Sequence, residues 1–344
     1  MSEFIQLHLL TSYPPANLNR DDLGRPKTAL MGGTERLRVS SQSLKRHWRV
    51  SELFQEALAG HLGTRTKRFG LEIHQQLLDA GVAEKQAREW AASIAGVFGK
   101  GKKDSLEIEQ LAHISPAEQK AAQALAVLLA EEKRAPTKEE LALLKHDHSA
   151  VDIALFGRML ASTPEYSVEA ACQVAHAISV HSVVVEDDYF TAVDDLNDGK
   201  DDAGSAHIGE SGFAAALFYS YICINKSQLL ESLGGNTELT GQTIRALVEA
   251  AAKVAPSGKQ NSFASRAYAS YVLAEKGAQQ PRSLSVAFLK PVQGEDYLAD
   301  AIAALENQVE RFDQAYGPCA DQRSTLNLLS AEGSLADILN FASA

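Results

Sequence analysis

The sequence predicts an α+β protein whose centre is a split βαβ, ferredoxin-like sheet that carries two large insertions. Three observations lead to this fold class. Segments with strand character occur near the start of the chain and again after residue 150, and helical segments alternate with the later ones. Residues 60–150 lie between them and are rich in Ala, Leu, Glu and Lys, with few β-branched residues. A helical insertion therefore divides the sheet domain into residues 1–59 and 151–344.

Composition gives an ordinary globular chain with an uneven charge. The 344 residues suit one large domain or two, and 45% are hydrophobic and 22% charged. A net charge of −11 argues by itself against nucleic-acid binding. However, residues 1–49 carry eight Lys/Arg against four acids, whereas residues 186–202 carry eight acids and one lysine. This segregation predicts a basic groove on an acidic body.

The cysteines and the apolar runs indicate in which cellular compartment the protein is expected. The three cysteines are far apart and form no C-x-x-C pair, so neither a zinc ribbon nor a disulfide framework is predicted. No signal peptide is visible, and the longest apolar run, residues 213–224, is too short to span a bilayer. We therefore expect a cytoplasmic protein without a membrane partner.

The first strand is predicted over residues 4–11, where apolar residues recur with enough alternation for a strand. A loop over residues 16–38 follows, with glycine, proline and asparagine as turn residues. Loops of this length are uncommon inside compact domains unless they have a function.

A helix is then predicted from Ser40 or Ser41 to about residue 59. Either serine can cap the helix, because its hydroxyl accepts a first-turn N–H that has no intrahelical partner. Lys45 and Arg49 are four residues apart and share a basic face, while a second, apolar face with Leu44 and Trp48 suits burial. The N–H groups at a helix start bind phosphate readily. The alternative is a solvated basic helix start.

The insertion is predicted to be helical, and its start signals are clear. Ser115 and Pro116 form an N-cap followed by proline at the first helical position, and Thr137 with Glu140 resembles a capping box. The predicted helices cover residues 71–80, 83–95, 116–133 and 137–145.

Strand signals return in the second half of the chain. We predict strands over residues 151–157, 189–193, 213–225, 268–273 and 284–289. Helices are expected over 168–178, 241–254 and 296–316. Residues 194–212 are polar and glycine-rich, which is typical of an exposed flap or hairpin, and residues 317–344 form a weakly patterned tail.

No catalytic motif survives inspection. The turn at residues 96–103 resembles a phosphate-binding P-loop, but Lys103 replaces the Ser/Thr that would hold Mg²⁺ and a helix precedes it. The acidic run at 194–199 lacks the ligands of an EF-hand at the third and twelfth positions. His176 and His181 miss the spacing of a zinc-binding helix pair. We expect no cofactor, and whether the acidic run binds a metal stays open.

Side chains of the kinds that contact phosphates gather in two places instead, the first loop with its following helix start and a loop near residue 260. The candidates are Arg20, Lys27, Arg38, Ser40, Gln42, Lys45, Arg46, Arg49, Lys259 and Gln260. Beside the flap, one of Tyr189 and Phe190 should point outward, where it could stack on bases or wedge between them. RNA-binding RRM domains use the same ferredoxin-like architecture.

Five motifs resemble those of a known family, the CasC (Cse-four) backbone subunits of the type I-E CRISPR Cascade complex. In chain order they are NRDD (19–22), RVSSQSLKR (38–46), VDIALFGRM (151–159), FTAVDDL (190–196) and GSAHIG (204–209). The resemblance covers roughly residues 1–290, and the five motifs are specific together. It implies an RRM-like palm, helical fingers at 60–150 and a thumb hairpin at about 190–212.

The resemblance also implies a function and partners. Copies of such a subunit polymerise head to tail along one CRISPR RNA and present it for pairing with target DNA. The other Cascade subunits (large, small, guide-processing and end-capping) join them, and a nuclease-helicase is recruited to cut DNA. The subunit itself is not an enzyme, and assembly is antiviral.

Several residues receive roles from the resemblance alone. Arg158 and Met159 would lie near the guide, and Phe190 and Thr191 at the point where the thumb kinks it. A basic helix would face DNA, with Lys133, Arg134, Lys138 and Lys145 as its cations. Two alternatives remain open: a type III-like subunit in which Asp194 or Asp195 cleaves target RNA, and a stand-alone RNA-binding module.

Overall fold

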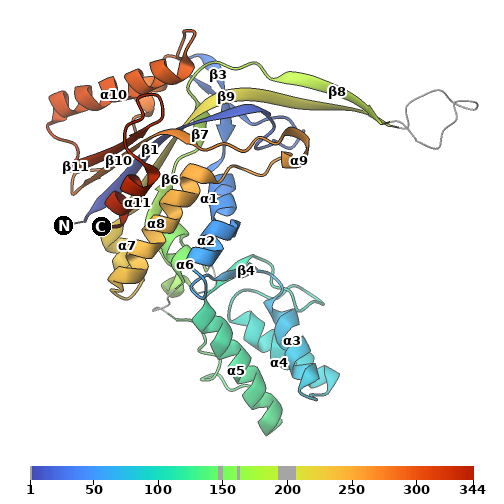
Figure 1. Cartoon of the computed structure of the whole chain (residues 1–344). Helices are drawn as coiled ribbons and strands as arrows, with labels where there is room; N and C mark the ends of the chain where they lie inside the picture. Colours follow the sequence, from blue (N-terminus) through green and yellow to red (C-terminus); the bar gives the residue numbers. More distant parts are fainter. Residues whose placement is uncertain (1, 146–149, 161–162, 193–206) are drawn as a thin grey trace, which may run out of the picture.

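A computed structural model describes residues 2–145, 150–160, 163–192 and 207–344 of the chain (Figure 1). Its centre is a nine-stranded antiparallel sheet with the strand order β11-β10-β1-β9-β7-β3-β2, and β6 and β8 also pair with β9. The strands are β1 (Phe4–Ala16), β2 (Thr28–Met31), β3 (Thr34–Val39), β6 (Cys172–Val174), β7 (Ala177–Ser179), β8 (Glu186–Ala192), β9 (His207–Asn225), β10 (Ala269–Gly277) and β11 (Gln322–Asn327). The predicted α+β class is confirmed.

Helices cover both faces of this sheet, because its central strands are apolar on both sides. On β1, Ile5, Leu7 and Leu9 face one core, and Leu10 faces a second core with Tyr219 of β9. The first face is covered by α1 (Ser41–Val50), α2 (Glu52–Ala57), α6 (Val151–Phe156), α7 (Lys226–Ser232), α8 (Thr237–Lys253) and α11 (Leu335–Ser343). The second is covered by η2 (Ser285–Phe288) and α10 (Tyr297–Tyr316). A short helix, α9 (Gln260–Phe263), and a 3-10 turn, η1 (Pro164–Tyr166), lie in connecting loops.

The insertion has a hydrophobic core of its own, and it extends away from the sheet in Figure 1. Its elements are β4 (Thr64–Thr66), α3 (Phe69–Asp79), α4 (Glu84–Gly96), β5 (Ala112–Ile114) and α5 (Pro116–Glu132), and β4 pairs with β5. The helix predicted over 137–145 is wrong, since the described residues there form turns. Thr137 and Glu140 do bond each other's backbone N–H groups, at 3.3 and 2.8 Å, but they close only one turn.

Four other predictions of secondary structure are wrong. Residues 151–156 form helix α6 and not a strand, because a short run that is buried all round has no period to separate the two. The helix expected over 168–178 is replaced by β6 and β7, which pair with β9. The strand expected over 284–289 is the 3-10 helix η2, and the tail supplies β11 and α11 to the core.

The opening helix is also shorter than predicted, because it ends at Val50. Ser51 has an extended ψ of 144°; its N–H bonds Trp48 O, and its hydroxyl accepts from the N–H of Phe54. One residue therefore ends α1 and caps α2, and the chain turns between them.

A two-stranded ribbon of β8 and the first part of β9 projects from the body in Figure 1, where the predicted flap begins and ends. All seven residues of β8 are exposed. Residues 193–206, which include most of the flap as predicted, lie outside the described residues. No helix in the described part of the chain is long and apolar enough to cross a membrane.

Candidate nucleic-acid interface

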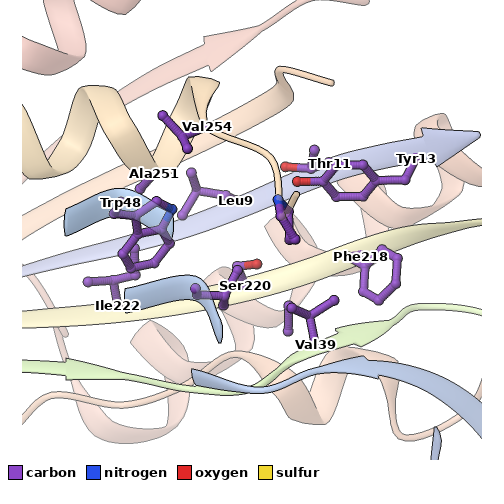
Figure 2. A pocket seen from close by; sticks show the side chains of 13 residues that line it. Leu9, Thr11, Tyr13, Val39, Trp48, Phe218, Ser220, Ile222, Ala251 and Val254 are labelled. Carbon is purple, nitrogen blue, oxygen red and sulfur yellow. The ribbon is translucent and has the colours of Figure 1, made fainter. Parts of the chain in front are cut away.

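Helix α1 is fixed on the sheet by its apolar face and capped at its start as predicted. The hydroxyl of Ser40 accepts the N–H of Ser43 at 3.3 Å, and the N–H of Ser40 donates to the side chain of Asn19 at 2.9 Å. Leu44 and Trp48 are buried against the sheet. Figure 2 shows Trp48 above Ile222 and beside Leu9, around a cavity of about 20 Å³ that is too small for a ligand.

The polar side of α1 borders an open groove of about 420 Å³ between the sheet domain and the insertion. Lys45 and Arg46 reach it from α1, and Arg65 reaches it from β4. The residues that line the groove are Gln42, Lys45, Arg46, Arg49, Arg65, Gln110, Leu111, His113, Phe156, Gly157, Arg158 and Met159. The ammonium of Lys45 lies 5.5 Å from the centre of the Phe156 ring, a cation–π distance.

Arg49 lies in this groove but is held by a buried carboxylate. Its guanidinium is 3.3 Å from Oδ2 of Asp152, which is fully buried on α6. Asp152 also accepts from His113 Nε2 and from the N–H of Gly63, both at 2.8 Å. Burial alone would raise the pKa of Asp152, but the hydrogen bonds from His113 and Gly63 and the charge of Arg49 outweigh burial and lower it. The Asp152 carboxylate therefore joins α1, the insertion and α6.

Arg158 takes a structural place that the resemblance did not imply. Its guanidinium lies 2.7 Å from the carboxylate of Glu118, and both side chains are buried. It also donates to the carbonyls of His113 and Tyr166. Arg158 thus lies beneath the groove and supports its wall, whereas the next residue, Met159, is 86% exposed.

The predicted cations of the first loop lie near the start of α1. Arg38 of β3 bonds Nδ1 of His176 at 2.8 Å, Lys27 is half-buried, and Arg20 is exposed. The loop is ordered by Asn19 and by the hairpin of β2 and β3, so the long loop expected over 16–38 contains regular structure. Arg20, Lys27 and Arg38 extend the positive surface beyond the groove.

The second predicted loop is engaged in local contacts. Lys259 Nζ lies 2.5 Å from Oγ of Ser211 on β9, and Gln260 donates to the carbonyl of Pro256 at 3.0 Å. A Cβ on Gly258 would lie 2.3 Å from the carbonyl oxygen of Leu18, so only glycine permits this approach. The loop thereby fastens the base of the ribbon to the first loop.

On the ribbon, Tyr189 and Phe190 are both exposed, at 65% and 43%. The expectation that only one would point outward is wrong, because both side chains are exposed. Phe190 is the register partner of Gly209, and a Cβ there would lie 2.3 Å from its ring. Phe190 therefore lies across the neighbouring strand, and Thr191 follows it on the exposed ribbon.

Phe190→Ala should leave the fold and the phosphate contacts intact, since the side chain lies outside every core described. We expect the free energy of unfolding to change by less than about 0.5 kcal/mol. RNA affinity should fall no more than Tyr189→Ala lowers it. Calorimetry and RNA titration of both variants measure this, and complete loss of RNA binding in the Phe190 variant would contradict it.

The cations assigned to a DNA-facing helix do not lie on a helix. Helix α5 ends at Glu132, and Lys133 follows in the left-handed region. Arg134 donates to Glu140 at 2.6 and 2.8 Å and to Glu132 at 2.5 Å, and Glu140 has a pKa lowered to about 2 by Arg134. The Arg134 charge is thus compensated, whereas Lys138 and Lys145 are exposed on the turns that follow.

Comparison with known proteins shows to which family the chain belongs. Residues 5–340 match the family described as CT1975-like protein. The chain belongs to this family. No curated protein matches the chain significantly.

Solved structures extend the comparison of this CT1975-like protein. A chain from "CRISPR RNA-guided surveillance complex, pre-nicking" has 30% sequence identity and a TM-score of 0.84, over 98% of this chain and 100% of that one. A chain from "CRISPR RNA-guided surveillance complex" has 26% identity and a TM-score of 0.62, over 98% and 99%. The resemblance to CRISPR backbone subunits is confirmed at the level of the family.

Several groove residues of this CT1975-like protein were not predicted from the sequence. Arg65, His113 and Phe156 lie in or beside segments predicted as insertion or strand, and nothing local marks them as partners of α1. The pairing of His113 with Asp152 joins residues 39 positions apart. Only the polar aspartate at the start of an otherwise apolar run, 151–156, was a signal.

Proposed function

We propose that this chain is a non-catalytic, CRISPR RNA-binding backbone subunit of a Cascade-type surveillance complex, of type I-E. The observation that carries the proposal is the groove beside α1. There Lys45, Arg46 and Arg65 converge with hydrogen-bonding amides of Gln42 and Gln110. Such groups hold phosphates without reading bases, which suits a guide whose sequence varies. Base pairing then supplies the specificity for target DNA.

The fold supports the roles of palm, thumb and fingers. The order β10-β1-β9-β7, with α1 and α8 on one face, supports an RRM-like palm built from residues 1–59 and 151–344. The projecting ribbon supports the thumb and the separately cored insertion, 60–150, supports the fingers. Lys133, Arg134, Lys138 and Lys145 would lie toward target DNA.

Assembly is the expected consequence. Identical copies joined head to tail form an open filament unless the rotation closes, so RNA length would set the copy number. The remaining complex subunits would cap and flank this filament, and a recruited nuclease-helicase would cut the DNA. RNA contacts are assigned to Arg20, Lys27, Arg38, Ser40, Gln42, Lys45, Arg46, Arg49, Met159, Phe190, Thr191, Lys259 and Gln260. Arg158, which the resemblance also places near the guide, supports the groove wall through Glu118 instead.

Sizing the purified chain with and without guide RNA tests the proposal. We expect a particle whose mass, measured by light scattering, grows with the length of the RNA. A monomer whose size RNA does not change would instead favour a stand-alone module. Incubating the assembled particle with complementary RNA and Mg²⁺ tests catalysis. Regular cleavage that Asp195→Ala abolishes would overturn the non-catalytic assignment.

A further inference from the structure

One edge of the His113 ring is turned toward the protein, and the residue lines the groove. Nε2 lies 2.8 Å from Oδ2 of Asp152. A Cβ built on Gly63 would lie 3.0 Å from both Cδ2 and Nε2, so this edge of the ring faces inward. Nδ1 lies on the opposite edge, and His113 lines the groove with Lys45 and Arg49.

The contact with Asp152 fixes which nitrogen carries the proton. An ionised carboxylate only accepts hydrogen bonds, so Nε2 must donate, and in the neutral imidazole Nδ1 is then an acceptor. Asp152 cannot easily turn away, because it is fully buried and also bonded to Gly63 and Arg49. The Asp152 carboxylate, on α6, is itself fixed by Gly63 and by Arg49 of α1. It therefore holds His113 in one tautomer.

The His113 side chain is 11% exposed, and the residue lines the groove. No residue in the described ranges donates to its Nδ1, and this atom is not among the buried polar atoms that lack partners. Its neighbours along the groove are cations, which bring phosphate oxygens close. A neutral acceptor repels a phosphate oxygen and needs a donor instead. The one donor on a ribose-phosphate backbone is the 2′-hydroxyl, which DNA lacks.

We propose that Nδ1 of His113 accepts a hydrogen bond from a ribose 2′-hydroxyl, with Asp152 as the positioning residue, so that the groove selects RNA over DNA. This inference rests on the proposed RNA-binding function and adds the group that distinguishes the sugar. The cations supply affinity for either nucleic acid, and His113 supplies the preference.

The test compares a short single-stranded RNA with the same sequence carrying 2′-fluoro sugars, which keep an RNA-like shape but cannot donate. The full chain is titrated at about pH 8. The unaltered protein should bind the fluorinated probe about three- to tenfold more weakly for each copy bound, the size of one neutral hydrogen bond. His113→Phe, which removes both nitrogens and therefore the acceptor, should bind both probes equally. His113→Gln keeps a donor for Asp152 and has an amide oxygen that can accept from the hydroxyl, so it should retain part of the preference.

Lys45→Ala is the matched control. Phosphates are common to both probes, so this variant should lower both affinities by the same factor and keep their ratio. If the unaltered protein binds both probes equally, the inference is wrong and RNA binding stands. If His113→Phe retains the original ratio, another group reads the hydroxyl and the inference is likewise wrong. Binding of neither probe would overturn the proposed function together with it.

Discussion

Replacing Lys45 and Arg46 by glutamate in one variant should abolish the retention of guide RNA while the protein stays folded. Each substitution turns a groove cation into an anion, and neither side chain is buried. Removing two phosphate contacts should lower the slope of log affinity against log salt by about 1.4. Repulsion by the new carboxylates should weaken binding further, by at least about 100-fold at low salt. RNA co-purification and salt titrations measure both effects.

The matched control for this variant is Lys85→Glu with Arg88→Glu on α4. It makes the same change in net charge at exposed positions outside the groove. We expect it to retain guide RNA almost fully. If the two variants behave alike, overall charge and not the groove decides RNA binding. Arg49 is left unaltered in this design, because a glutamate there would face the buried carboxylate of Asp152.

Glu118→Gln should destabilise the insertion strongly. It leaves the Arg158 guanidinium buried without its carboxylate, which typically costs about 3–5 kcal/mol. Burial alone would raise the pKa of Glu118, but hydrogen bonds from Arg158 and from the N–H groups of Ser115 and Lys145 lower it, so the carboxylate is charged at neutral pH. Calorimetry should show an earlier unfolding transition.

Glu131→Gln provides the control on the same helix, since that side chain is exposed. Its effect should stay within about 0.5 kcal/mol. Adding Arg158→Met to the Glu118 variant removes the unpaired cation and should recover part of the loss. Unfolding of the Glu118 variant at the temperature of the unaltered protein would show that the pair does not support the groove wall.

The part of the site on α1 could be predicted from the sequence, because it depends on residues close together in the chain. The cap at Ser40, the buried Leu44 and Trp48, and the neighbouring cations all lie within one short helix, where spacing alone fixes which side chains share a face. Turns with clear residues were also predictable, as at the start of α5, where the capping box between Ser115 and Glu118 forms.

The rest of the site depends on contacts between distant segments. Whether 151–156 is helix or strand is not decided by its own residues, because all positions but the last are buried. Its place beside β5 is set only when the insertion folds, and the joining of Arg49, His113 and Asp152 follows from that. Arg158 has a charge typical of a ligand contact, and only tertiary structure reveals that Glu118 neutralises it.

Strand β9 runs without interruption from the ribbon, at His207, to the centre of the sheet, at Asn225. Its inner part pairs with β1 over most of its length, and its outer part pairs with β8. The ribbon and the centre of the sheet therefore share one continuous strand. A change in the direction of the ribbon would twist β9 and disturb its hydrogen bonds to β1. The direction of the ribbon is therefore set by the sheet. If copies join head to tail as proposed, the packing of the core in each copy would fix where its ribbon reaches on the next copy, and so the spacing between them.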